Sequence, residues 1–434
     1  MGSRRRSRRA VVAACGVALA GCAEGTGTPS DGQGTGPQTT GTTRTTRSGT
    51  TQTTYNAPAW FTDRGNLQHT ASAPGGVSVP LRERWRRSLG TRIESSPVGG
   101  HGTVLVGAND GTLYALDPTD GTTRWTYDAG SPVTTAPTAV TENKGADEFV
   151  WVASKDGRVH SVEPGTGNRR WRTSGGTGTF NSAVNYATGT VYQSYMDGPV
   201  TSTLRAIDGR NGTVQWTGSV NNVSTATPMH GFGTVHVGIE QGGTVFETYD
   251  ALSGSAGWTL WNTTSNAGSS TSGVLHSDVP EGDSALVITS TENGFVGGYT
   301  VGAGGEVWRT DLSEFGVVEG LALTQNRSTN TLVVAQRNAM YGLDPGSGSV
   351  RWTFSHVRNQ NPRNVATRRT AQPAIYGDHV FQIVGGSELV ALSLANGTRE
   401  WGASIASDTH SSPLVGGNTV YVGDASGDVI AYSP

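Results

Sequence analysis

Two matching stretches of the 434-residue chain place charged side chains and a histidine in front of a Ser-Ser-Pro motif. One reads TRIESSP and the other SDTHSSP, so that Arg92 aligns with Asp408. In the same alignment, Glu94 matches His410. Carboxylate, imidazole and guanidinium groups at one place can bind a ligand or exchange protons with it. Two readings stay open: an exposed charge pair that stabilises the fold, or part of a site for a ligand or a partner protein.

A second charged group lies in the stretch SHVRNQNPRNVATRRT, residues 355–370. It concentrates arginine on an otherwise acidic chain, at positions Arg358, Arg363, Arg368 and Arg369. Loops on a rigid scaffold often carry binding residues. This loop is either a solvated insertion or a docking site for an acidic partner or headgroup, whose affinity would fall as salt rises.

Acids and tryptophans also recur together, with glycine four residues after the acid and tryptophan four residues after the glycine, as in Asp117, Gly121 and Trp125. The other complete copies begin at Glu163, Asp208, Asp250 and Asp344, and two further copies keep glycine and tryptophan without the acid. An active site needs one such carboxylate, whereas a spacing of roughly 40–50 residues indicates a repeated structural unit. We therefore expect each acid to hydrogen-bond the backbone of its own turn.

Motifs that would indicate catalysis or metal binding are missing from the sequence. It has no G-x-S-x-G turn, no H-E-x-x-H pair and no phosphate-binding loop. His230 and His236 flank a predicted turn, and we expect no metal there. The two cysteines, Cys15 and Cys22, both precede the body of the chain, so the body has neither a disulfide nor a thiolate site.

Each repeat predicts four short strands. Two strand-like runs precede the acid–glycine–tryptophan pattern: a small, proline-bearing run such as ESSPVG (94–99) and a β-branched run such as TVLVG (103–107). A third strand ends at the acid, and a fourth surrounds the tryptophan, with glycine and aspartate in the turns. Four strands in a repeat of this length are typical of a propeller blade.

The two ends of the chain complete one blade between them. The last repeat stops after DASGDVIAYSP (424–434) without its tryptophan strand, whereas the strand around Trp85 precedes the first repeat. Pairing the Trp85 strand with 429–432 uses every strand and removes the open edges. We therefore predict an all-β fold, a single eight-bladed β-propeller over residues 58–434 whose ring is closed by this pairing.

The tryptophans are predicted to hold the blades together. Each one would pack between adjacent blades with its indole N–H on a backbone carbonyl. The series comprises Trp85, Trp125, Trp171, Trp216, Trp258, Trp308, Trp352 and Trp401.

The N-terminal residues predict export and attachment to a membrane. Residues 1–21 form a signal peptide, with an arginine-rich start and an apolar run that is too short to span a bilayer. SRRAVV resembles a twin-arginine export signal, and LAGC resembles a lipobox, which implies a lipid on Cys22. Residues 22–57 are rich in Thr, Gly and Ser and predict a disordered tether. We expect a lipid-anchored protein at the cell surface or on the periplasm-equivalent side of the cytoplasmic membrane.

The charge of the chain argues against a nucleic-acid partner. Its formal net charge is −3, although five arginines lie in the first nine residues. The body is therefore more acidic than the whole chain, and it offers no basic surface for phosphate groups.

LYALDPTDGTTRW and its copies resemble the tryptophan-docking repeats of pyrroloquinoline-quinone (PQQ)-like β-propellers. WFTDRGNLQHTA (60–71) followed by RWRRSLG resembles the leading segment of that family's repeat proteins, so the likeness covers residues 58–434. One branch, the quinoprotein dehydrogenases, holds PQQ and Ca²⁺ in a central funnel and uses a Cys–Cys disulfide, which this body lacks. No residues match its Ca²⁺ ligands. The other branch contains BamB-type lipid-anchored scaffolds without a cofactor, and a lipobox, a tether and a funnel that looks empty agree better with it.

The resemblance implies a cell-surface, lipid-anchored scaffold that binds other membrane or cell-surface proteins. We expect no cofactor, no enzymatic activity and a monomer. Two alternatives stay open. One is a PQQ-dependent or sugar oxidoreductase that uses the funnel with PQQ and Ca²⁺, and the other is an extracellular sensor that binds a ligand or a carbohydrate.

Overall fold

Short β-strands separated by glycine turns make up the described chain, as its β-branched runs predict. The computed structural model describes residues 60–434 except 61, 63, 67, 143–146, 176–182, 188, 198–200, 222–226, 240–243, 262–269, 277–284, 292–293, 303, 316–317, 325–329, 337, 357–370 and 407–408. The predicted signal peptide, Cys22 and the tether lie outside these residues. In the described part of the chain the only helical turn is η1 (Ser313–Phe315), and no helix is long and apolar enough to cross a membrane.

Eight blades follow one another along the described chain, each an antiparallel sheet of four strands. In blades 1 to 7 these strands run in sequence order from the inner to the outer edge, and blade 7 carries β1 (Ser72–Ala73) as a fifth, parallel strand at its inner edge. In blade 8 the outer strand comes from the other end of the chain. Blade 1 contains β3 (Val98–Gly100), β4 (Thr103–Gly107), β5 (Thr112–Leu116) and β6 (Thr123–Asp128). Blade 2 contains β7 (Thr138–Glu142), β8 (Asp147–Ala153), β9 (Val159–Val162) and β10 (Arg169–Arg172). Blade 3 contains β11 (Ala183–Ala187), β12 (Thr190–Met196), β13 (Thr201–Asp208) and β14 (Val214–Asn221). Blade 4 contains β15 (Met229–Gly231), β16 (Thr234–Gly238), β17 (Thr244–Asp250) and β18 (Ala256–Trp261).

The second half of the ring repeats this order. Blade 5 contains β19 (Ser270–His276), β20 (Leu286–Thr291), β21 (Phe295–Thr300) and β22 (Glu306–Asp311). Blade 6 contains β23 (Val318–Leu323), β24 (Leu332–Gln336), β25 (Ala339–Leu343) and β26 (Val350–Ser355). Blade 7 contains β27 (Ala374–Tyr376), β28 (His379–Val384), β29 (Glu388–Ser393) and β30 (Arg399–Ser404). Blade 8 contains β31 (Leu414–Gly416), β32 (Thr419–Gly423), β33 (Asp428–Ser433) and, from the other end of the chain, β2 (Arg82–Ser88).

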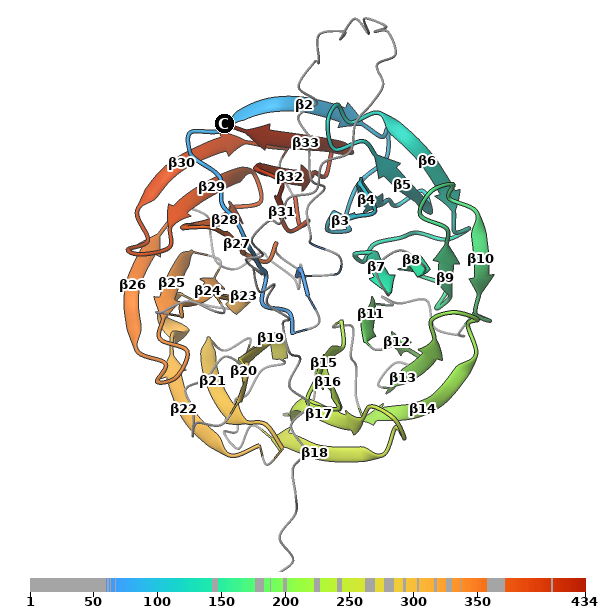
Figure 1. The fold of residues 1–434 in the computed structure, drawn as a ribbon. Coiled ribbons are helices and arrows are strands. Elements are labelled where there is room, and N and C mark those ends of the chain that lie inside the picture. Colours follow the sequence, from blue (N-terminus) through green and yellow to red (C-terminus); the bar gives the residue numbers. More distant parts are fainter. Residues whose placement is uncertain are drawn as a thin grey trace, which may run out of the picture. The chain divides into compact units, whose positions relative to one another are not determined.

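The blades form a closed ring. Each innermost strand contacts the innermost strand of the next blade, from β3 through β7, β11, β15, β19, β23, β27 and β31 back to β3 (Figure 1). The ring closes where predicted, because β2 pairs antiparallel with β33. In this ladder Arg82 faces Ser433 and Trp85 faces Ala431. The predicted eight-bladed β-propeller is therefore confirmed.

Seven of the eight repeated tryptophans join neighbouring blades through the predicted indole bonds, and the eighth, Trp258, packs on Gly304 of the next blade. Trp125 donates its indole N–H to the carbonyl of Pro164 in the next blade at 2.6 Å. Equivalent bonds of 2.9–3.1 Å are made by Trp85, Trp171, Trp216, Trp308, Trp352 and Trp401. Trp401 reaches Leu81, just before β2, because the chain ends interrupt the turn that the other blades provide. Each bond satisfies a polar group that the packing would otherwise leave unpaired.

The turn between the third and fourth strands needs its glycine for two reasons. Gly121 has φ +74°, and a Cβ there would lie 2.6 Å from the ring of Trp85 in the preceding blade. The acid of the same turn caps the backbone, as predicted: Asp117 accepts the N–H of Thr119 at 2.7 Å. Asp117 also forms a 2.8 Å ion pair with Arg124. The recurring acid, glycine and tryptophan therefore build the ring.

Candidate functional site

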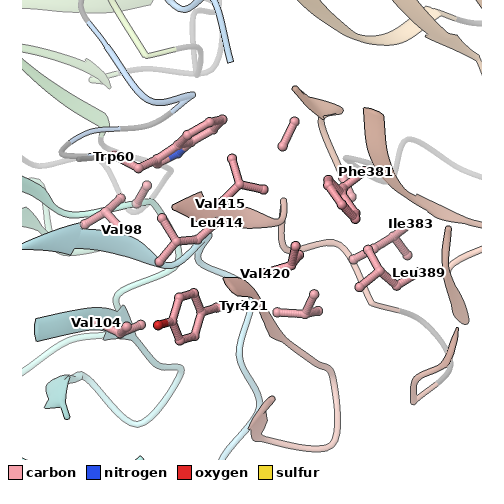
Figure 2. Packing of buried hydrophobic residues seen from close by; sticks show 14 of the residues in the cluster. Trp60, Val98, Val104, Phe381, Ile383, Leu389, Leu414, Val415, Val420 and Tyr421 are labelled. Atoms are coloured by element: carbon pink, nitrogen blue, oxygen red, sulfur yellow. The ribbon is translucent and has the colours of Figure 1, made fainter. Parts of the chain in front are cut away.

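The interior of the ring contains a segment of the chain itself, the described residues among 60–73 (all but 61, 63 and 67). The segment crosses the ring between the inner strands (blue in Figure 1) and ends in β1 (Ser72–Ala73), which pairs parallel with β27 of blade 7. Its first residue, Trp60, is 3% exposed. Trp60 lies beside Val98 of blade 1 and Val415 of blade 8 (Figure 2). Part of the space between the inner strands is thus taken up by the chain's own residues.

Main-chain hydrogen bonds hold this segment against the inner strands. An innermost strand has one edge without a strand neighbour, and its N–H groups need acceptors when they are buried. The segment supplies carbonyls to blades 1, 5, 6 and 7 over 2.7–3.0 Å, in the pairs Gly99–Trp60, Leu275–Gln68, Leu323–Thr70 and Ile375–Ala71. The contacts run from backbone to backbone, so no side-chain motif reveals them in the sequence.

Arg64 is the main side-chain anchor of the segment. It is 7% exposed, and its Nη1 and Nη2 donate to the carbonyls of Gly273 and Leu321 at 2.6 and 2.7 Å. These carbonyls belong to blades 5 and 6, so one guanidinium joins two blades. On the other side of the interior, the hydroxyls of Thr62 and Thr138 lie 3.0 Å apart. Bonds between a charged donor and carbonyl oxygens are stronger than neutral ones.

His69 is buried in the same segment, with 2% of its surface exposed. Burial, together with the nearby positive charge of Arg64, lowers the pKa of His69 well below its usual value. A protonated imidazole would place a second cation near Arg64, away from water. His69 is therefore neutral at neutral pH.

The two Ser-Ser-Pro motifs adjoin at one end of the interior. The backbone N–H of Ser412 donates to Oγ of Ser96 at 3.0 Å, across the boundary between blades 8 and 1. Nε of Arg92 donates to Oε1 of Glu94 at 3.1 Å, and their side chains are 35% and 33% exposed. His410 is half-buried, two residues before Ser412. Asp408 lies outside the described residues, and a binding role for the four residues stays a prediction.

A chain of polar contacts that we did not predict continues from this place. Gln372 donates its backbone N–H to Oγ of Ser412 at 2.8 Å and its Nε2 to the carbonyl of Glu319 at 2.7 Å. With the bond between Ser412 and Ser96, these contacts link blades 6, 7, 8 and 1. Gln372, Ser412 and Ser96 each stand directly before a proline at the start of an inner strand. That position was the signal available in the sequence.

The arginine-rich loop is the remaining predicted site. Strand β26 ends at Ser355, and Arg358, Arg363, Arg368 and Arg369 lie outside the described residues. The structure thus gives no position for these side chains, and docking through them stays a prediction.

The two histidines on adjacent strands point to opposite faces of their sheet. In the ladder between β15 and β16, His236 faces Met229, so its neighbour His230 lies on the other face. His230 stacks on Tyr192 of blade 3, with ring centres 5.7 Å apart, whereas His236 meets Trp258 edge-on at 6.0 Å. The two imidazoles cannot bind one metal ion and have packing roles.

The described residues were also compared with the needs of a Ca²⁺ site. Calcium takes six to eight oxygen ligands, including carboxylates. In the described ranges, no three Asp, Glu, His or Cys side chains come close enough to hold a metal ion.

Comparison with known families gives a match along the whole ring. The family model described as outer membrane protein assembly factor BamB matches residues 81–193, 144–246 and 241–434. The comparison with curated protein sequences finds no match.

Solved structures with low sequence identity have the same fold. Quinohemoprotein alcohol dehydrogenase from Pseudomonas putida HK5 is 13% identical with a TM-score of 0.68, over 86% of this chain and 80% of that one. BamB from Moraxella catarrhalis is 14% identical with a TM-score of 0.60, over 82% of this chain and all of the other. At such low sequence identities, these structural matches establish the fold and nothing about the activity. Because the family model matches segments through every blade, the chain belongs to this family of PQQ-like β-propellers, described as outer membrane protein assembly factor BamB.

Proposed function

We propose that this protein is a scaffold that docks other membrane or cell-surface proteins and works as a monomer without PQQ. In this proposal a lipid on Cys22 attaches it to the outer side of the cytoplasmic membrane, and residues 22–57 tether the ring. Membership of a family described as an outer membrane protein assembly factor supports the docking role. The lipobox-like LAGC supports the attachment.

One observation carries the proposal: the interior of the ring is occupied by residues 60–73 of the same chain. A propeller enzyme of the quinoprotein type would need that space for its cofactor and substrate. With the interior occupied, the surfaces left for a partner are the rims of the ring and its outer strands. Loops and turns on such a rigid frame are well suited to protein recognition.

The rim where blades 8 and 1 meet is the first place to look for a partner. Arg92 and Glu94 are each about one-third exposed and bind one another. An ion pair at such a surface contributes about 0–1 kcal/mol to stability. The fold therefore has little need of these charges, and an approaching protein can use them for specificity.

The experiment compares partners captured by matched variants. Intact lipid-modified protein is cross-linked in membranes of its source and purified as wild type, as Glu94→Ala/His410→Ala, and as Glu400→Ala/His379→Ala. The last pair is the control, because it removes an acid and a histidine that lie 2.8 Å apart on blade 7. We expect a defined partner that the rim variant loses and the control retains. A protein that cross-links to nothing specific, or equally in all three forms, would contradict docking at this rim.

A further inference from the structure

The inner edges of blades 5, 6 and 7 bind a turned polypeptide segment that ends in the two-residue strand β1. We propose that β19, β23 and β27 form a peptide-binding site that residues 60–73 fill within the monomer, and that the same segment of a second copy can take its place. The proposal goes beyond docking at the rim and does not depend on it. Its ligand class is a turned polypeptide that offers backbone carbonyls.

The main chain provides most of the recognition. The N–H groups of Leu275, Leu323 and Ile375 donate to three carbonyls of the segment within 3.0 Å. In β1, Ser72 lies in register with Ile375 as a parallel neighbour. At blade 7 the segment thus adds a two-residue strand to the sheet edge, whereas at blades 5 and 6 it offers carbonyls without forming a strand. As in strand addition, backbone bonds give affinity and a few side chains give specificity.

Two side chains make the site specific for this segment. The guanidinium of Arg64 joins the carbonyls of Gly273 and Leu321, which lie on neighbouring blades. Trp60 is buried at the other end of the segment, and its carbonyl accepts the N–H of Gly99 at 2.8 Å. A peptide without the arginine would leave both carbonyls without this donor.

The proposal requires the segment to separate from the ring without opening it, and three features favour this. Pro74, Gly75 and Gly76 follow it, and all three are exposed. Beyond this hinge, β2 holds blade 8 closed through a seven-residue strand, whereas β1 has two residues. The segment also contains three non-glycine residues in the left-handed region: Arg64 and His69 at φ 57° and Ala71 at φ 51°. Such backbone conformations are strained. Release of the segment therefore removes a conformational free-energy cost that is absent from β2.

The first test is amide hydrogen exchange in the full-length wild-type protein. Local opening exposes a group of amides without global unfolding. We expect the amides of Leu275, Leu323 and Ile375 to exchange together, at least tenfold faster than those of the middle strands β20, β24 and β28 in the same blades. Equal rates for the two groups would overturn the proposal, because the segment would then leave only when the ring unfolds.

The second test supplies the segment from outside. A fluorescent peptide of residues 58–77 is added to the wild-type chain, to Trp60→Ala/Arg64→Ala, and to the control Arg87→Ala/Thr126→Ala, which alters exposed outer strands. The internal segment competes at a high effective concentration. We therefore expect at least tenfold tighter binding to the Trp60/Arg64 variant than to the other two chains, and weaker binding of a peptide carrying Arg64→Ala. Equal binding to all chains, or none to a folded variant, would overturn the proposal. If the variant does not fold, the exchange experiment decides.

Discussion

Single residues determine how the blades meet. Trp85, at the start of the chain's ordered repeats, packs on Gly121 and donates its N–H to Pro118 of the same turn at 3.1 Å. The same contact between a tryptophan and a glycine recurs at Trp125 and Gly167. The tryptophan supplies the packing surface and the glycine leaves the space for it. We therefore expect replacement of either residue alone to lower the stability of the fold.

Replacing the turn glycine by alanine separates packing from backbone conformation. Gly121→Ala places a Cβ 2.6 Å from Trp85 at φ +74°, whereas Gly130→Ala has φ +77° with nothing within 4 Å. The left-handed conformation costs about 1–2 kcal/mol in either variant. The steric clash adds about 1–3 kcal/mol in Gly121→Ala alone. Urea unfolding of both variants measures the difference, and equal midpoints would show that Trp85 does not pack on this turn.

Buried histidines make the stability of the ring sensitive to acid. His160 is buried between Tyr127 and Ser154, which lie 2.8 and 3.0 Å from its two ring nitrogens. Burial lowers the pKa of His160 to about 4. The unfolded chain then takes up a proton near pH 6.5 and the folded chain does not, so the free energy of unfolding falls as the pH drops from 6.5 towards 4.

The test of this pH dependence is urea unfolding at pH 7, 6 and 5. His160→Gln removes one titrating group, and we expect it to lose less stability than wild type over this range, by about 1.4 kcal/mol per pH unit below 6.5. His236, whose pKa burial also lowers to about 4, supplies a similar slope that the variant retains. The same slope in wild type and variant would mean that His160 titrates alike in the folded and unfolded chains.

Two neighbouring elements differ in how far the sequence predicts them. Strand β2 was predicted because it carries Trp85 and repeats the pattern of the other outer strands. The location of residues 60–73 was not, because their bonds go to backbone groups far away in sequence: Arg64 binds a carbonyl 257 residues downstream. The chain of contacts through Gln372 was missed because its partners are also far away in sequence, 40 residues to Ser412 and 53 to Glu319. Repeats predict the elements that resemble one another, whereas unique segments need the structure.

Ring closure by β2 can be tested with a disulfide. Arg82 and Ser433 face one another in the ladder between β2 and β33, and the described body has no cysteine of its own. Arg82→Cys/Ser433→Cys should form a bond that holds the ends of the ring together. We expect oxidation to stabilise the variant by about 2–4 kcal/mol relative to its reduced form. Failure to form the bond in the folded protein would contradict the pairing of these strands.

At the largest scale, the described body is a ring of eight blades with part of its own chain between the inner strands. The number of blades and the pairing that closes the ring were predicted from the count of strands in the sequence. The position of residues 60–73 against the inner strands was seen only in the structure. In the proposed function, the side chains that would distinguish one binding partner from another are those of the rim and of the arginine-rich stretch 355–370. The repeat carries no information on them, because Arg92, Glu94 and His410 are unique to their blades.

The most direct test of the proposal that this protein functions without PQQ is to supply PQQ and measure whether it binds. The full-length protein is incubated with PQQ and Ca²⁺, dialysed, and examined for the absorbance of bound quinone and for dye-linked oxidation of alcohols and sugars. Because residues 60–73 occupy the interior, we predict that no quinone is retained and that no dye is reduced above a sample without protein. One equivalent of retained PQQ with Ca²⁺-dependent dye reduction would contradict the account and identify the ring as an oxidoreductase.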